Sequence, residues 1–252
     1  MINFVGAGPG AEDLITVRGK KLLEEADVII YAGSLVNPRL LEYAKSECEI
    51  YDSASMTLEQ VIEVMLAAEK SNKKTVRLHT GDPSIYGAIR EQMDMLDKHN
   101  IGYQVCPGVS SMFGAAAALK AEYTLPNVSQ SVIVTRMAGR TPVPEREEIS
   151  LLAAHNATMV IFLSAGMLKE LSERLIRGGY SADTPAAVVY KATWEDEKIV
   201  RTTVGRLAES AEKNGIIKTA LITVGGFLGR EYDRSKLYDP HFTHEYRRGA
   251  DN

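Results

Sequence analysis

Cysteine is scarce in this chain of 252 residues, where Cys48 and Cys106 are the only two. Their spacing is not that of a metal motif, and the five histidines, which include His79, His99 and His155, form no such motif either. We therefore expect buried free thiols and no protein-bound metal.

Long hydrophobic runs and an excess of basic residues are missing as well. No uninterrupted apolar stretch is long enough to cross a bilayer, and Ile2 already enters an expected strand without a basic and apolar leader before it. A cytoplasmic location with no membrane partner is therefore expected. The formal net charge of -4 argues against nucleic acid as a partner, because binding nucleic acid usually needs a concentrated basic face.

What the chain does contain is the composition of a globular protein, 45% hydrophobic and 25% charged, with enough length for one large or two smaller domains. In the first half, short apolar runs alternate with segments of helical spacing such as 58–69, which predicts a mostly parallel sheet with crossover helices. The expected strands are 2–5, 28–31, 49–51, 76–78 and 103–105.

The second half predicts a mixed sheet, because only residues 191–197 separate two strand-like runs and so indicate a hairpin. We expect strands at 131–134, 158–163, 186–190, 198–204 and 219–224, and helices near 146–154, 167–177 and 205–214.

The pattern breaks at Pro126 and Asn127. The sequence therefore predicts two α/β domains, 1–121 and 122–252, with a ligand cleft between them. The second domain ends in a polar tail that starts at Arg230.

The segment Thr80–Gly87, with the sequence TGDPSIYG, follows a buried strand and is expected to open a helix. Gly81 allows another molecule to approach the backbone closely, Pro83 suits the first turn of a helix, and Asp82 adds a carboxylate that only accepts hydrogen bonds. In open α/β sheets, ligands bind beyond the carboxyl ends of the strands. Taken alone, this pattern fits a ligand loop and a well-capped turn about equally well.

A second glycine cluster, Val5–Gly10, follows the opening strand in the same way, so both loops are expected to serve one site. Its glycine spacing is not that of a dinucleotide fingerprint, and it lacks the Gly-Lys-Ser/Thr of a phosphate loop. Tyr31 also ends the next strand where an NAD site needs an acidic residue. A third loop, 106–111, brings Ser110 and Ser111 to the start of an alanine-rich helix at 114–121, where hydroxyl and N–H groups can meet a ligand.

Read in order, several motifs resemble those of the tetrapyrrole methyltransferases, which use S-adenosylmethionine (SAM). They are 5–10, 14–19, 80–87, 107–111, 160–164, 188–194 and 220–225, and they extend over nearly the whole chain. Within that family, the segments 31–36, 77–83, 128–136 and 139–142 resemble the branch of cobalamin biosynthesis that methylates carbon 11 of precorrin-4 or its cobalt form. The segment Ala11–Asp13 departs from the pattern, because relatives often carry Asp-Pro there.

The resemblance implies that SAM binds between the two domains, that S-adenosylhomocysteine is the product, and that the protein is a homodimer. The implied cofactor contacts are Pro9, Thr80, Gly81, Asp82, Ile85, Ser110, Ser111, Leu163, Ala192 and Thr219. A tetrapyrrole carries many carboxylates, so candidate substrate-binding residues lie beside the motifs: Arg18, Tyr86, Arg90, Arg136 and Arg140.

Methyl transfer from a sulfonium requires no covalent protein intermediate, so alignment of the two substrates is expected to dominate. We assign no essential base among His79, Asp82 and Tyr86. The alternatives are methylation at another corrin or porphyrin carbon or of a protein side chain, a non-catalytic tetrapyrrole carrier, and an NAD-dependent enzyme. The sequence does not distinguish a cobalt-bearing acceptor from a metal-free one.

Overall fold

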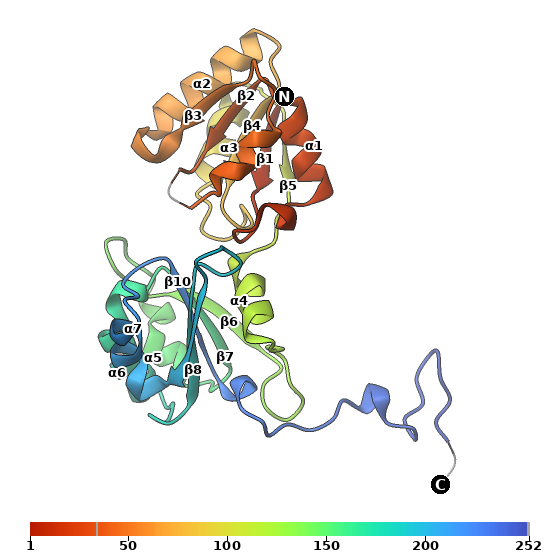
Figure 1. Cartoon of the computed structure of the whole chain (residues 1–252), viewed down its shortest axis with the longest axis vertical. Coiled ribbons are helices and arrows are strands. Elements are labelled where there is room, and N and C mark those ends of the chain that lie inside the picture. Colours follow the sequence, from red (N-terminus) through yellow and green to blue (C-terminus); the bar gives the residue numbers. More distant parts are fainter. Residues whose placement is uncertain (34, 251–252) are drawn as a thin grey trace. The chain divides into compact units, whose positions relative to one another are not determined.

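The computed structural model describes residues 1–33 and 35–250, which form two compact α/β units (Figure 1). The first unit is Met1–Gly114 with Ala192–Asp196, and the second is Ala115–Lys191 with Glu197–Asn252. The change between units thus comes at residue 114, inside a helix, whereas the sequence places its boundary at residue 121. Residues 192–196 also pack with the first unit, because Trp194 contacts the loop after the first strand.

The sheet of the first unit has five strands, all parallel, which confirms the prediction of a mostly parallel sheet. The order of the strands is β3-β2-β4-β1-β5. Its strands are β1 (Ile2–Gly6), β2 (Val28–Tyr31), β3 (Glu49–Asp52), β4 (Thr75–His79) and β5 (Tyr103–Cys106). Gly6 is paired with His79, and Val5 with Cys106. The carboxyl ends of β1, β4 and β5, from which the three predicted loops emerge, therefore lie side by side.

Helices cover both faces of this sheet, because alternate residues of each strand point to opposite sides. On one face, α1 (Val17–Glu25) buries Leu23 against Val5 and Leu78. On the other face, Phe4 packs in a cluster with residues of α2 (Leu58–Lys70) and α3 (Arg90–Lys98). Helix α2 lies where the segment 58–69 predicts a helix, whereas no limits were predicted for α1 or α3.

The second unit has a mixed sheet in the order β6-β7-β10-β8-β9. Only the pair β6–β7 is parallel, and β8–β9 is the predicted hairpin. The strands are β6 (Val132–Arg136), β7 (Thr158–Phe162), β8 (Pro185–Tyr190), β9 (Lys198–Thr203) and β10 (Ala220–Val224). The prediction of two α/β sheets, one parallel and one mixed, is confirmed.

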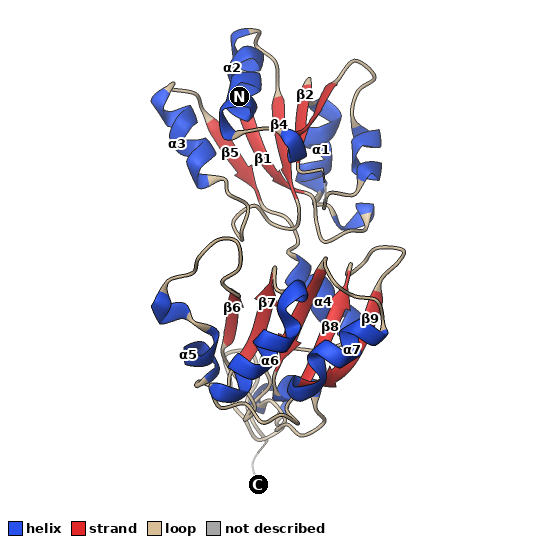
Figure 2. Ribbon diagram, turned by 90° about the vertical axis from the view of Figure 1, so that its left-hand side faces the viewer, coloured by secondary structure: helices blue, strands red, loops and turns tan. Residues whose placement is uncertain are grey.

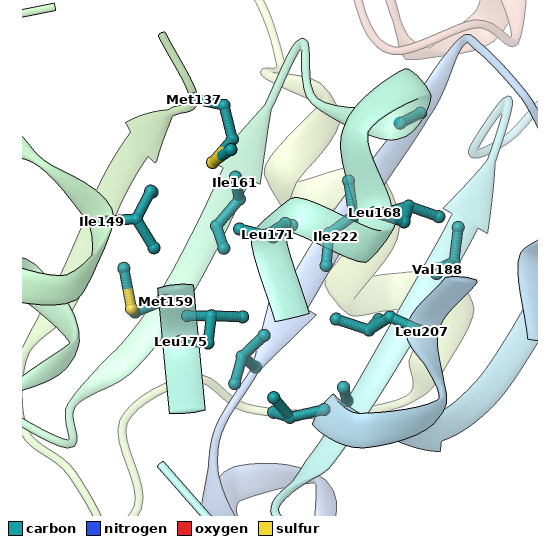
Figure 3. Packing of buried hydrophobic residues seen from close by; sticks show 14 of the residues in the cluster. Met137, Ile149, Met159, Ile161, Leu168, Leu171, Leu175, Val188, Leu207 and Ile222 are labelled. Atoms are coloured by element: carbon teal, nitrogen blue, oxygen red, sulfur yellow. The ribbon is translucent and has the colours of Figure 1, made fainter. Parts of the chain in front are cut away.

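The main core of the second unit lies between this sheet and three helices (Figures 2 and 3). Leu171 and Leu175 of α6 (Leu168–Arg177) and Leu207 of α7 (Leu207–Lys213) are fully buried there, with Ile149 of α5 (Ile149–Ala153) at its edge. These helices are the predicted ones with shorter ends.

The remaining helix, α4 (Ser111–Leu119), starts three residues earlier than predicted. Short 3-10 turns complete the structure at Glu12–Leu14, Pro38–Tyr43, Ser53–Ser55, Glu145–Glu147, Ala165–Met167, Val204–Arg206, Gly226–Leu228 and Lys236–Tyr238. None of the helices described for residues 1–33 and 35–250 combines the length and apolar character that a membrane span requires.

Candidate functional site

The loops that follow β1 and β4 are hydrogen-bonded to each other at the carboxyl end of the first sheet. The Gly8 N–H donates to Gly81 O at 3.2 Å, and the Gly81 N–H donates to Gly8 O at 2.9 Å. Both glycines have a left-handed backbone, with φ of +82° and +63°, and residues other than glycine rarely adopt this conformation. The sequence prediction that the two glycine loops share one site is thereby supported.

A third loop, after β5, packs against the other two without room for a side chain. A Cβ on Gly6 would lie 2.5 Å from Gly108 Cα and 2.6 Å from Gly81 O, and a Cβ on Gly108 would overlap the same carbonyl. We call Gly6, Gly81 and Gly108 the glycine cradle. These contacts close the three loops tightly onto one another where three parallel strands end, which is where ligands bind in open α/β sheets.

Asp82 joins the loops after β4 and β5. Its Oδ2 accepts a hydrogen bond from the Gly108 N–H at 2.8 Å, and its Oδ1 accepts from the Ser84 N–H at 2.9 Å and from the Ser84 hydroxyl. Burial acts to raise the pKa of Asp82, but these hydrogen bonds outweigh it and lower the pKa below the usual aspartate value. Asp82 is therefore an ionised bridge within the protein, and each of its oxygens accepts at least one of these three bonds.

The expectation that a helix begins within Thr80–Gly87 is wrong. The segment forms a turn in which Tyr86 and Ala88 have φ of 56° and 49°, and α3 starts only at Arg90. The Ser84 N–H donates to the Asp82 carboxylate, and residues with a left-handed backbone cannot continue a right-handed helix, so no helix forms here. A Cβ on Gly87 would overlap Pro83 O, which shows how tightly the turn closes.

A series of buried hydrogen bonds, which was not predicted from the sequence, supports this turn. Arg77 donates from Nε to Gln92 Oε1 at 3.1 Å and from NH1 to Ile30 O at 3.2 Å, and Gln92 donates to Ala88 O at 2.9 Å. Burial lowers the pKa of Arg77 to about 10, so the guanidinium stays charged at neutral pH. Alternation in β4 was the available signal, because Thr75, Arg77 and His79 alternate with the apolar residues Val76 and Leu78 in a buried strand.

His79 ends β4 and is only 4% exposed. Burial, with a smaller contribution from the positive charge of Arg77, lowers its pKa to about 3. The ring is therefore neutral at physiological pH, and its Nε2 has no hydrogen-bond partner among the described residues. A group this weakly basic and this deeply buried does not serve as a general base.

The remaining predicted cofactor residues of the first unit lie on the same three loops or beside them. Thr80 has a buried Oγ1 that lacks a partner within residues 1–33 and 35–250, and Ser110 is 4% exposed just before α4. Ser111 starts α4, where backbone N–H groups are unpaired by the helix itself. Ile85 is half-buried in the turn, while Pro9 and Ala192 are buried.

The two predicted cofactor residues of the second unit share one edge of its sheet. Leu163 directly follows β7 and Thr219 directly precedes β10, its antiparallel neighbour. Both have left-handed backbone, with φ of 52° and 56°, and Leu163 is 63% exposed. A strained, exposed leucine at a strand end is more typical of a functional position than of a packing one.

The predicted substrate arginines differ in how many of their N–H groups are already used. Arg136 donates to the carbonyls of Met137, Thr141 and Pro142 at 2.7–3.1 Å, and so it organises the loop after β6. Arg90 pairs with Asp94 at 2.8 Å on the surface of α3.

Arg18 and Arg140 are exposed, and neither has an ion pair or side-chain hydrogen bond to another described residue. Tyr86, the fifth candidate, is 46% exposed on the turn. Of the four arginines, Arg18 and Arg140 therefore keep the most N–H groups for a carboxylate ligand.

The chain is similar to known proteins of one family. A family model described as tetrapyrrole (corrin/porphyrin) methylases matches residues 1–208, which include all three loops. The chain belongs to this family. The resemblance drawn from the sequence motifs is thus confirmed for the methylase family, with Ser34 of the segment 31–36 outside the described residues.

Individual methylases are also similar over nearly their full length. A cobalt-precorrin-4 C(11)-methyltransferase from Methanocaldococcus jannaschii is 60% identical, over 97% of this chain and 95% of the relative. The solved cobalt precorrin-4 methyltransferase CbiF has a TM-score of 0.89 at 49% identity, and the match covers 91% of this chain and 96% of CbiF. A uroporphyrin-III C-methyltransferase from Thermus thermophilus, solved with S-adenosyl homocysteine, has a TM-score of 0.74 at 25% identity over 90% and 93% of the two chains.

Replacing Asp82 with asparagine tests the bridge. The amide keeps one acceptor oxygen, so one of the connections to Gly108 or Ser84 is lost. We expect the free energy of unfolding of the first unit to fall by about 1.5–3 kcal/mol, as for a hydrogen bond to a charged group. Urea denaturation followed by the fluorescence of Trp194, the only tryptophan and a residue of the first unit, measures this.

Asp94→Asn, which removes the exposed pair with Arg90, is the control and should change stability by under about 0.5 kcal/mol. Equal stabilities of the two variants would contradict the bridging role.

The buried neutral His79 predicts a specific pH dependence. Between its ordinary pKa of 6.5 and about 3, the unfolded chain takes up a proton that the folded chain does not, so the free energy of unfolding decreases as the pH falls through this window. In His79→Asn this decrease should be smaller, whereas in His155→Asn, which alters an exposed histidine, it should be unchanged. Denaturation curves at several pH values give the slopes. A wild-type slope retained in His79→Asn would show that this ring is not the titrating group.

Proposed function

We propose that the protein methylates carbon 11 of cobalt-precorrin-4, using SAM, in the biosynthesis of cobalamin. The observation that carries this proposal is the 60% identity over nearly the full chain with a relative named for this reaction. The fold match to CbiF at a TM-score of 0.89 supports it. Because both names specify a cobalt acceptor, the cobalt form is favoured over metal-free precorrin-4.

The residues at the candidate site fit SAM. The three loops meet at the carboxyl ends of β1, β4 and β5, where ligands bind in open α/β sheets, and the buried Thr80 hydroxyl lacks a protein partner among the described residues and can bond to a ligand. In this proposal Pro9, Thr80, Gly81, Ile85, Ser110, Ser111 and Ala192 of the first unit contact the cofactor, with Leu163 and Thr219 from the second. Asp82 is the remaining proposed contact, and it also holds the loops after β4 and β5 together.

The chemistry assigns the protein a positioning role. When bound, SAM supplies an electrophilic methyl group, and its transfer to a ring carbon leaves a neutral thioether. The residues of the site have to hold the acceptor carbon in line with that methyl group and exclude water, and such alignment contributes about 7–11 kcal/mol in favourable intramolecular reactions. Neither the buried His79 nor the engaged Asp82 is available as a strong base, which agrees with this division of labour.

For the acceptor's carboxylates, Arg18 and Arg140 are the proposed first contacts, because their guanidinium groups are exposed and unpaired among the described residues. Tyr86 adds an exposed aromatic ring on a rigid turn. Arg136 and Arg90 take part only if they exchange their present partners. A cytoplasmic homodimer, with the ligand in a cleft between the two domains, stays a prediction.

One alternative is methylation at another tetrapyrrole carbon, because the similar Thermus thermophilus protein is named for uroporphyrin-III. The higher identity to the carbon-11 relative, 60% against 25%, favours carbon 11. A non-catalytic carrier would need no site for SAM, and the 60% identity with a relative named as a methyltransferase argues against it.

Product analysis tests the proposal. The purified protein is incubated anaerobically with SAM and cobalt-precorrin-4, precorrin-4 or uroporphyrinogen III, and the product is examined by mass spectrometry and carbon NMR. We expect a gain of one methyl group, located at carbon 11, with the fastest rate on the cobalt form. Methylation of uroporphyrinogen III alone, or no methylation despite binding of S-adenosylhomocysteine, would contradict the assignment.

A further inference from the structure

The connection between β8 and β9 packs on the turn that follows β1. We call residues Ala192–Asp196 the clasp. The indole Nε1–H of Trp194 donates to Pro9 O at 3.2 Å, and the ring lies so close to Gly10 that a Cβ there would overlap it. Gly10 is therefore required by the tryptophan ring, independently of any ligand.

Thr193 makes a second connection to the same turn. Its Oγ1 accepts a hydrogen bond from the Ala11 N–H at 3.0 Å, and a Cβ on Gly114 would lie 2.9 Å from Pro9 Cβ and 3.3 Å from Thr193 Cγ2. Thr193 and Lys191 have left-handed backbone, with φ of 71° and 45°. Such conformations are unfavourable for residues other than glycine and persist only where the surroundings fix them. The clasp is thus a defined structure rather than a loose hairpin end.

Polar contacts from the segment after β2 hold the clasp and the turn in place. Arg39 lies 2.7 Å from Glu195 and 3.6 Å from Glu12, and Asn37 donates to Gly10 O at 2.9 Å. The carbonyls of Pro9 and Gly10 consequently both accept bonds from side chains distant in sequence, and Gly8 is paired with Gly81 on the other side. The turn is fixed from two directions, by the clasp and by the loop after β4.

We propose that Trp194 is a positioning residue that holds the Pro9–Gly10 turn in the conformation that binds the cofactor, so that cofactor binding and the environment of the indole are coupled. This inference rests on the proposed function, because it takes the turn to be part of a SAM site. The coupling follows from geometry, because Pro9 is both a proposed ligand contact and the residue whose carbonyl accepts the hydrogen bond of the indole N–H.

Two variants separate the hydrogen bond from the ring. Trp194→Phe keeps an aromatic ring on Gly10 and loses the N–H donor, and we expect binding of S-adenosylhomocysteine to weaken about 2- to 10-fold. Trp194→Ala also removes the packing and should weaken binding by more than about 10-fold. Tyr246→Ala, which removes an aromatic ring that is 87% exposed, is the control and should leave the affinity unchanged.

Isothermal calorimetry with S-adenosylhomocysteine measures these affinities without requiring turnover. In the wild type, titration with S-adenosylhomocysteine should also shift the fluorescence of Trp194, the only tryptophan, with the same dissociation constant as calorimetry. A merely structural tryptophan would give no such shift. Amide exchange at Gly10 and Ala11 should be faster in Trp194→Phe than in the wild type.

The outcomes distinguish this inference from the proposed function. If the wild type binds S-adenosylhomocysteine without a shift in the emission of Trp194, and Trp194→Phe binds it with unchanged affinity, the positioning role is wrong while the methyltransferase assignment stands. If the emission shifts and Trp194→Phe binds more weakly but carbon 11 is not methylated, the positioning role stands and the acceptor assignment is wrong. A wild type that binds no S-adenosylhomocysteine would overturn both.

Discussion

The carboxylate of Asp82 is the interaction on which the candidate site depends. Three loops leave adjacent parallel strands and would otherwise be free to move apart, and Asp82 bonds the turn after β4 to the backbone N–H of Gly108 after β5. The paired glycines 8 and 81 then attach the loop after β1. Glycine at positions 6 and 108 is a consequence of this arrangement, because the three backbones approach too closely for any side chain.

A second layer of polar groups keeps the turn in its strained form. Arg77 and Gln92 are 7% and 5% exposed, and the chain of hydrogen bonds that they form ends at the carbonyl of Ala88, which is one of the two left-handed residues of the turn. Burying a guanidinium without a carboxylate partner is unfavourable, so this face of β4 lowers the free energy of unfolding. The cost is consistent with a site in which the conformation of one turn matters more than maximal stability. The clasp stabilises the neighbouring turn in the same way, through Trp194 and Thr193.

Much of this architecture could be predicted from the sequence, because strands and glycine loops are local signals. The runs 2–5, 28–31 and 76–78 alternate with helical patterns, and they gave the parallel sheet and the position of the loops. The start of the helix after Pro83 could not be predicted, because the hydrogen bond of Asp82 to Ser84 and the positive φ values of Tyr86 and Ala88 leave no signal at non-glycine residues. The contact of Trp194 with Pro9 was equally hidden, since 185 residues separate the two in sequence.

Hydrogen–deuterium exchange with and without S-adenosylhomocysteine tests most directly whether the three loops act as one cofactor site. We predict that S-adenosylhomocysteine slows amide exchange in all three segments, 6–11, 80–87 and 108–111. In Asp82→Asn this protection should be smaller in each of them, including the loop after β1 that Asp82 does not contact. Protection confined to one loop, or found only elsewhere in the chain, would contradict it.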